Sequence, residues 1–327
     1  MKKYSRPSLK RAQSKGTPDP IVRCYVVCGL AIVFCVGLML TIPDYRLFQA
    51  TVAISYAISL LGLNLLTGYS GQFSLGHGAF FAIGAYTAAI MADRLNAPFW
   101  ISLPVGGILC FCLGYLFGFP ALRLDSVYLA LATFALSLSL PQLLKSPALQ
   151  MFTGGVQGLS ILKPDPPDGI LLSADQWIFI CAALIATVLF IIAAHLVYGP
   201  FGRALMAVRD HAAAAESMGV NSKQFKTLAF GISALYAGIG GGLSAFAIQF
   251  VAPDSFTAFL SISLLIGIVV GGIGTLSGAL YGAVFLTVIP SLTDSVSRDA
   301  PWLVYGLVLI AAIFVFPAGL AGKFRKR

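Results

Sequence analysis

Residues 176–198 read QWIFICAALIATVLFIIAAHLVY and contain no lysine, arginine, aspartate or glutamate. A run of this length and apolarity can cross a bilayer as a helix. Similar runs recur along the 327-residue chain, which is 58% hydrophobic and only 10% charged, against about 25% charged in soluble proteins. The sequence therefore predicts an all-α protein, a polytopic bundle embedded in the membrane.

Charges and clusters of proline and glycine divide the chain into about ten such runs, each near the length that a bilayer requires. The expected membrane helices cover residues 22–42, 47–66, 74–92, 97–119, 126–144, 176–198, 227–250, 257–272, 276–292 and 302–319. The connections at 67–73 and 273–276 carry no charge, so each is also compatible with a re-entrant or broken helix. A count of roughly eight or nine spans is the alternative.

Positive charge is concentrated on one side of this arrangement. With the basic N-terminus placed in the cytoplasm, 16 lysines and arginines fall on the cytoplasmic side and five outside, as the positive-inside rule requires. Orientation beside anionic lipid explains the net charge of +9, so no nucleic-acid partner is needed. We expect a basic cytoplasmic N-terminal arm (1–21), a transmembrane domain (22–320) and a basic cytoplasmic tail (321–327).

The expected cytoplasmic loop 199–226 is rich in helix formers. A single helix is predicted over residues 203–218, and the spacing of Leu205, Val208, Ala212 and Ala215 places them on one face of it. Gly219 is the expected left-handed C-cap, and Asn221 or Ser222 the N-cap of the next helix. The loop helix either lies on lipid or docks on a soluble partner. Four consecutive alanines bury little in lipid but allow close approach in a protein groove, which favours docking.

Catalytic and ion-coupling residues are missing from the sequence pattern. The expected spans hold no deep acid or base, which counts against an intramembrane enzyme and a proton-coupled transporter, although sodium sites built from carbonyls and hydroxyls stay open. The six cysteines and three histidines lack metal-ligand spacing, and no G-x-x-x-x-G-K-[ST] motif is present to bind ATP. Energy must therefore enter through the cytoplasmic loop.

Residues 66–89, LTGYSGQFSLGHGAFFAIGAYTAA, combine five glycines with polar residues and no charge. We expect the glycines to permit a chain reversal and close helix packing here and in the turn at 271–278, at Gly68, Gly71, Gly76, Gly84, Gly271, Gly272 and Gly274. Uncharged polar side chains in the spans are candidates for contact with a zwitterionic cargo, but each is equally compatible with hydrogen bonding between helices: Gln72, Ser74, His77 and Thr133.

The segment GRALMAVRDHAAAAESMGVNSKQFKTLAFGISALYAGIGGGLSAF (202–246) resembles the coupling-loop region of LivM-type branched-chain amino acid ABC permeases. Four further stretches resemble motifs of that family in the same order: residues 66–89, RLDSVYLALATFALSLSL, TGGVQGL and GIVVGGIGTLSGALYGA. The similarity therefore covers nearly the whole chain. The departures are the pair Asp210-His211 and the long basic N-terminal arm.

The resemblance implies one membrane half of an ABC importer in the bacterial inner membrane. It implies docking of the loop on a cytoplasmic ATPase through Gly202, Arg203, Ala207, Arg209, Glu216 and Gly219. The implied partners are a paralogous permease, two ATPases that bind ATP and Mg, and a periplasmic substrate-binding protein; this chain itself is expected to bind no cofactor. The implied cargo is leucine, isoleucine or valine, with urea, short amides or other amino acids as alternatives. A stand-alone channel or facilitator is the alternative of a different class.

Overall fold

The computed structural model describes residues 20–121, 126–167, 172–296, 301–316 and 319–325. Most of the basic N-terminal arm therefore lies outside the described residues, as do the last two residues of the tail. The body of the fold consists of long helices: α1 (Pro20–Thr41), α2 (Asp44–Asn64), α3 (His77–Leu95), α4 (Phe99–Ala121), α5 (Ser126–Leu144), α7 (Ala174–Tyr198), α10 (Ser222–Ile248), α11 (Ala258–Gly271), α12 (Leu276–Val296) and α13 (Pro301–Val315).

Each of these helices overlaps one of the expected spans, so the all-α membrane architecture is confirmed. Six described helical segments are long and apolar enough to cross a membrane. α11 has 14 residues, or roughly 21 Å of helix, which is shorter than the hydrocarbon core. The third helix begins at His77, so the break after α2 extends beyond the expected residues 67–73.

Shorter elements connect the long helices. They are the π-helical turn η1 (Leu65–Tyr69), α6 (Pro147–Thr153), η2 (Gly155–Gln157), β1 (Leu159–Ser160), α8 (Pro200–Asp210), α9 (Ala212–Ser217), β2 (Phe250–Val251), η3 (Pro253–Phe256) and α14 (Gly319–Arg325). β1 and β2 pair antiparallel, with Leu159 opposite Val251. This pairing ties the segment after α6 to the C-terminal end of α10.

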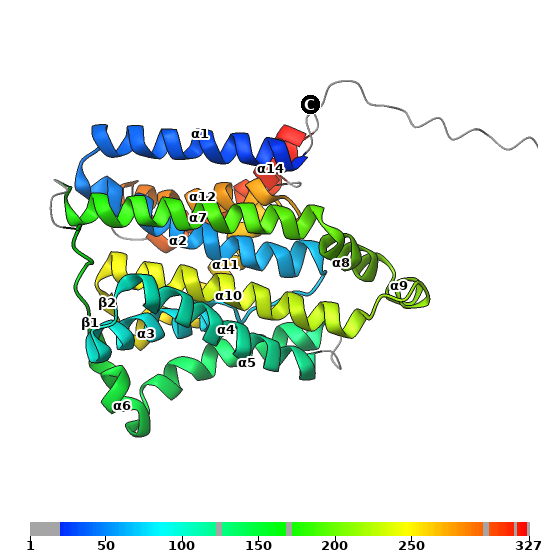
Figure 1. Cartoon of the computed structure of the whole chain (residues 1–327), viewed down its shortest axis with the longest axis horizontal. Helices are drawn as coiled ribbons and strands as arrows, with labels where there is room; N and C mark the ends of the chain where they lie inside the picture. Colours follow the sequence, from blue (N-terminus) through cyan, green and yellow to red (C-terminus); the bar gives the residue numbers. More distant parts are fainter. Residues whose placement is uncertain (1–19, 122–125, 168–171, 297–300, 317–318, 326–327) are drawn as a thin grey trace, which may run out of the picture.

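α10 is the central helix, packed against α2, α3 and α4 (Figure 1). Its most apolar window is 78% buried, against 33% for α5 on the outside of the bundle. Small residues allow the close approach: α3 crosses α10 where Gly84 faces Gly238, and a Cβ on Gly84 would collide with the Gly238 backbone. Backbone contact at this crossing fixes the angle between the two helices.

The two ends of the bundle carry different elements (Figure 1). α6, β1 and β2 lie at one end, and α8 and α9 project from the other. α14 and the first residues of α1 lie toward the α8 end. The expected coupling loop, the start of α1 and α14 therefore lie on the same side of the bundle.

Candidate coupling loop and helix break

The loop between α7 and α10 consists of two short helices. Pro200 occupies the first turn of α8, where its missing N–H costs nothing. His211, with φ −158° and ψ 89°, separates α8 from α9. The prediction of one helix over residues 203–218 is therefore wrong. Side-chain contacts at both ends override the strong local helix propensity: Arg209 is bonded to the α2–α3 break and Glu216 to Ser222 at the start of α10.

α8 is seated firmly on the bundle. Leu205 and Val208 are 1% and 3% exposed, as the predicted apolar face requires. Arg203 Nη1 donates to the carbonyl of Tyr198 at 3.1 Å. Gly202 is buried and packs so closely on the end of α7 that an added Cβ would collide with the carbonyl of Val197. α8 therefore has little freedom to move independently of α7.

α9 ends as the sequence predicts. Gly219 has φ +85°, and its N–H donates to the carbonyl of Glu216 at 3.0 Å. Asn221 caps α10, because its side chain accepts a hydrogen bond from the Gln224 N–H. Ala215 is buried and Ala212 only partly so. The exposed surface of the two helices and their ends is mixed. It carries small residues, polar or charged residues and one long apolar side chain: Ala207, Ala213, Ala214 and Ser217; Arg203, Arg209, Asp210, His211 and Glu216; and the 87% exposed Met218.

Arg209 joins this loop to the break between α2 and α3. Its Nη1 donates to the carbonyl of Gly68 at 2.7 Å, and its Nε donates to Oδ1 of Asp210 at 2.9 Å. The stem of Arg209 lies against Gly71, where an added Cβ would be 2.6 Å from Arg209 Cγ. Gly71 also has φ +73°. Glycine is therefore required at position 71 by both the turn and the arginine.

Asn64 joins the same break to the turn between α11 and α12. The side chain is fully buried; its Nδ2 donates to the carbonyl of Thr275 at 2.6 Å and its Oδ1 accepts from the Gly274 N–H at 2.8 Å. A Cβ on Gly68 would be 2.6 Å from the Gly274 nitrogen. The two uncharged connections of the sequence, far apart along the chain, are thus held in contact.

The α11–α12 turn has its own backbone requirements. Gly272 and Gly274 have φ values of +121° and +75°, which side chains disfavour. A Cβ on Gly271 would collide with the Gly278 carbonyl. Close backbone contact therefore accounts for the glycines of this turn.

The non-helical residues 70–76 connect η1 to α3, and all of them except the 46% exposed Phe73 are buried or half-buried. Gln72 is 7% exposed, and its Nε2 donates to Ser70 Oγ at 2.7 Å and to the carbonyl of Lys226 at 3.2 Å. Ser74 is 1% exposed, and its hydroxyl accepts from the Gly76 N–H. These buried bonds satisfy polar groups that lipid could not.

Hydroxyl groups from α5 and α11 form hydrogen bonds with backbone groups at the end of the α2–α3 break and the start of α3. Thr133 Oγ1 accepts from the Leu75 N–H at 3.0 Å, and Ser137 Oγ donates to the Leu75 carbonyl at 2.6 Å. Ser261 Oγ lies 2.8 Å from Ser137 Oγ and accepts from the Gly78 N–H at 2.9 Å. Because Thr133 is the eighth residue of the 19-residue α5, the break lies beside the middle of that helix.

His77 and Gly76 mark the start of α3. His77 is 1% exposed, and its Nε2 has no hydrogen-bond partner among the described residues. Gly76 packs on Thr133, with a Cβ position only 3.0 Å from Thr133 Cβ. All four pathway candidates are thus buried in this conformation. Their role in cargo contact stays a prediction.

Three residues of this network are not among those that the sequence predicts. Asn64, Ser137 and Ser261 each make a buried contact to a segment distant in the sequence. The available signal for Asn64 is an amide within an apolar helix, where polar groups need partners. Ser137 follows Thr133 by four residues, which places both on one face of α5.

A family model described as "Branched-chain amino acid transport system / permease component" matches residues 45–316. The high-affinity branched-chain amino acid transport system permease protein LivM of Escherichia coli is 32% identical over 299 residues, covering 83% of this chain and 68% of LivM. The autoinducer 2 import system permease protein LsrC of Photorhabdus laumondii is 28% identical, covering 88% of this chain and 87% of LsrC.

A probable branched-chain amino acid transport permease protein LivH of Methanocaldococcus jannaschii is 24% identical, covering 87% of this chain and 95% of LivH. No solved structure gives a significant match. The family is one of transport subunits and not of enzymes. The chain therefore belongs to the branched-chain amino acid transport permease family, as a LivM-type, multi-pass membrane protein.

Proposed function

We propose that this chain is one of two paralogous membrane halves of an ATP-driven importer of branched-chain amino acids in the bacterial inner membrane. The cargo assignment rests on the LivM and LivH relatives. The relative named for autoinducer 2 import makes another small polar cargo the alternative. ATP and Mg bind to separate ATPase subunits, because the chain has no nucleotide-binding motif of its own.

The observation that carries the proposal is the hydrogen-bonded path from the loop to the interior. Arg209 bonds α8 to Gly68, and Asn64 bonds the same segment to Gly274 and Thr275. A displacement of α8 would thereby move both the α2–α3 break and the α11–α12 turn. Many transporters place the substrate site at broken helices and alternate access by rocking one rigid bundle against another around that site.

The outward surface of α8 and α9 suits a protein partner better than lipid. Ala213 and Ala214 present little apolar area, while Met218 is a flexible apolar side chain able to fill an irregular cavity. A groove on each ATPase would accept this narrow surface. The opposite end of the bundle, braced by the β1–β2 pair and by the ion pair of Lys145 with Asp254 at 2.5 Å, would receive the substrate-binding protein.

Reconstitution into vesicles with a partner permease, two ATPases and a binding protein tests the proposal. We expect uptake of radiolabelled leucine that requires ATP hydrolysis. Replacing Glu216 and Gly219 by lysine should abolish both uptake and ATPase association, since both residues shape the end of α9. Leucine uptake that persists without ATP, or that survives the two lysines, would instead support a stand-alone facilitator.

A further inference from the structure

The end of the bundle opposite α8 and α9 exposes several large apolar side chains. They come from the last residue of α3, from α6 and from the segment that follows α6, and each is between 52% and 87% exposed: Leu95, Met151, Phe152, Val156 and Leu162. The elements that carry them contact one another, because α3 packs on both α6 and β1 and α6 packs on η2. We call this surface the apolar platform.

The apolar platform lies outside the hydrocarbon core of the membrane. Apart from the three residues of η2 and the two of β1, residues 154–167 are non-helical, and exposed irregular backbone does not occur in contact with lipid chains. Charged groups lie at the same level: Arg94 pairs with Asp93 at 3.1 Å, and the ion-pair partner of Lys145 is the 67% exposed side chain of Asp254. The exposed apolar side chains of this segment therefore face water or a partner.

The backbone of the platform is held in place by contacts on several sides. Thr153 Oγ1 donates to the last carbonyl of α5 at 2.7 Å, and Arg94 Nη2 donates to the carbonyl of Met151 at 2.9 Å. Gly158 has φ +73°, and a Cβ there would be 2.4 Å from the carbonyl oxygen of Val251 on β2. Because the apolar side chains are presented on a fixed backbone, a partner that binds them pays little to order the loop.

The charges around the platform favour a protein partner over a lipid surface. The platform's own segments and their ion-pair partners carry three basic and four acidic residues: Arg94, Lys145, Lys163, Asp93, Asp165, Asp175 and Asp254. These segments therefore lack the excess of lysine and arginine that attracts a protein to anionic lipid. An apolar centre with a polar rim is instead the usual anatomy of an interface between proteins.

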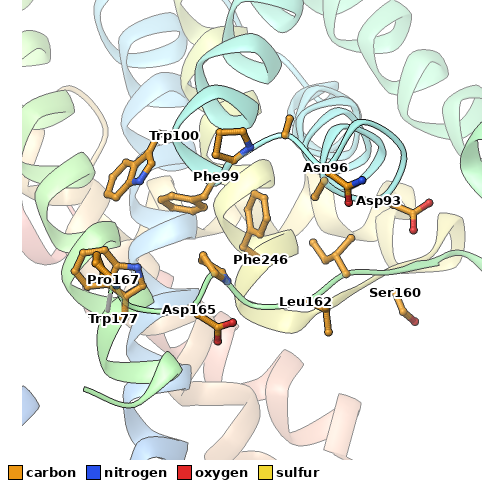
Figure 2. A pocket seen from close by; sticks show the side chains of 15 residues that line it. Asp93, Asn96, Phe99, Trp100, Ser160, Leu162, Asp165, Pro167, Trp177 and Phe246 are labelled. Atoms are coloured by element: carbon orange, nitrogen blue, oxygen red, sulfur yellow. The ribbon is translucent and has the colours of Figure 1, made fainter. Parts of the chain in front are cut away.

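A pocket of about 510 Å³ adjoins the platform, and Leu162 is part of its lining (Figure 2). Phe99 and Phe246 lie deeper in the same pocket, with their rings 5.0 Å apart and edge to face. Side chains that enter such apolar pockets contribute a large share of the binding energy between proteins. The platform thus offers both projecting side chains and a recess beside them.

We propose that the apolar platform is the docking surface for the substrate-binding protein, which covers Val156 and Leu162 and inserts an apolar side chain into the adjoining pocket. This inference rests on the proposed importer function and adds the residues by which the binding protein is recognised. The occupant comes from the external aqueous side, since α8 and α9 lie at the opposite end of the bundle (Figure 1). The binding protein is the soluble external partner of that importer.

Binding of a fluorescently labelled substrate-binding protein to the complete importer in lipid nanodiscs tests this assignment. Val156→Glu with Leu162→Glu should weaken binding on the order of tenfold, because two charges replace apolar contacts. Both side chains are mostly exposed, so the exchange should leave the melting temperature unchanged. Val156→Ile with Leu162→Met keeps the surface apolar; this matched control should bind with wild-type affinity.

A photoreactive residue at position 162 identifies the occupant without relying on the glutamate variant. Crosslinking to the binding protein supports the proposal, whereas crosslinking only to lipid or to the partner permease contradicts it. Wild-type affinity in the glutamate variant, at an unchanged melting temperature, would also overturn the docking surface. A failure of the importer function is a different result, because leucine uptake by the wild type would then be independent of ATP hydrolysis.

Discussion

Asn64 lies in an apolar helix, yet its side chain is expected to contribute strongly to the stability of the fold. The buried amide satisfies a backbone N–H and a backbone carbonyl of the α11–α12 turn. Asn64→Ala leaves both groups buried without partners, so we expect the free energy of unfolding to fall by about 2 kcal/mol or more. Thermal unfolding in detergent measures the change. Gln49→Ala, which removes a bond to the exposed Tyr45 hydroxyl, is the control and should cost little.

Glycines of this chain differ sharply in what surrounds them. Gly84 has backbone atoms of Gly238 where its Cβ would be, whereas Gly37 has no atom within 4 Å of that position. Gly84→Ala should therefore destabilise the bundle by roughly 1–3 kcal/mol. Gly37→Ala should change stability by less than about 1 kcal/mol. The same thermal assay compares the two, and equal melting temperatures would contradict the close α3–α10 crossing.

The sequence predicts where helices end more accurately than it predicts which distant segments they contact. The sequence predicts Gly219 as a cap and narrows the next N-cap to Asn221 or Ser222, because capping depends on residues within one turn. The break at His211 was missed because residues 203–218 favour helix locally, and Arg209 and Glu216 act through partners elsewhere in the chain. Asn64 was missed for the same reason, since Gly274 is some 210 residues away.

The projecting helices α8 and α9 make a prediction about subunit binding. Met218 is 87% exposed at the loop end and Met151 is 75% exposed at the opposite end. Met218→Glu should prevent co-purification of the ATPases, because a charge would replace the apolar side chain in their groove. Met151→Glu is the matched control and should leave co-purification intact. The reverse pattern would place the ATPases at the other end.

At the scale of the whole molecule, the apolar runs predicted the helical bundle, and the uncharged connections at 67–73 and 273–276 indicated where it is interrupted. Sequence patterns could not show that these two connections meet. That contact depends on side chains such as Asn64 and on the close approach of Gly68 to Gly274. The path from loop to interior is therefore a property of the assembled bundle.

We propose that Arg209 transmits movement of the loop to the bundle, and the ratio of leucine uptake to ATP hydrolysis in reconstituted vesicles tests this role most directly. In Arg209→Ala the ATPases should still bind and hydrolyse ATP, while uptake per ATP falls roughly tenfold. Lys223→Ala, which removes an exposed cation at the start of α10 and leaves the break intact, should keep the wild-type ratio. A wild-type ratio in Arg209→Ala, with both ATPases bound, would contradict the account.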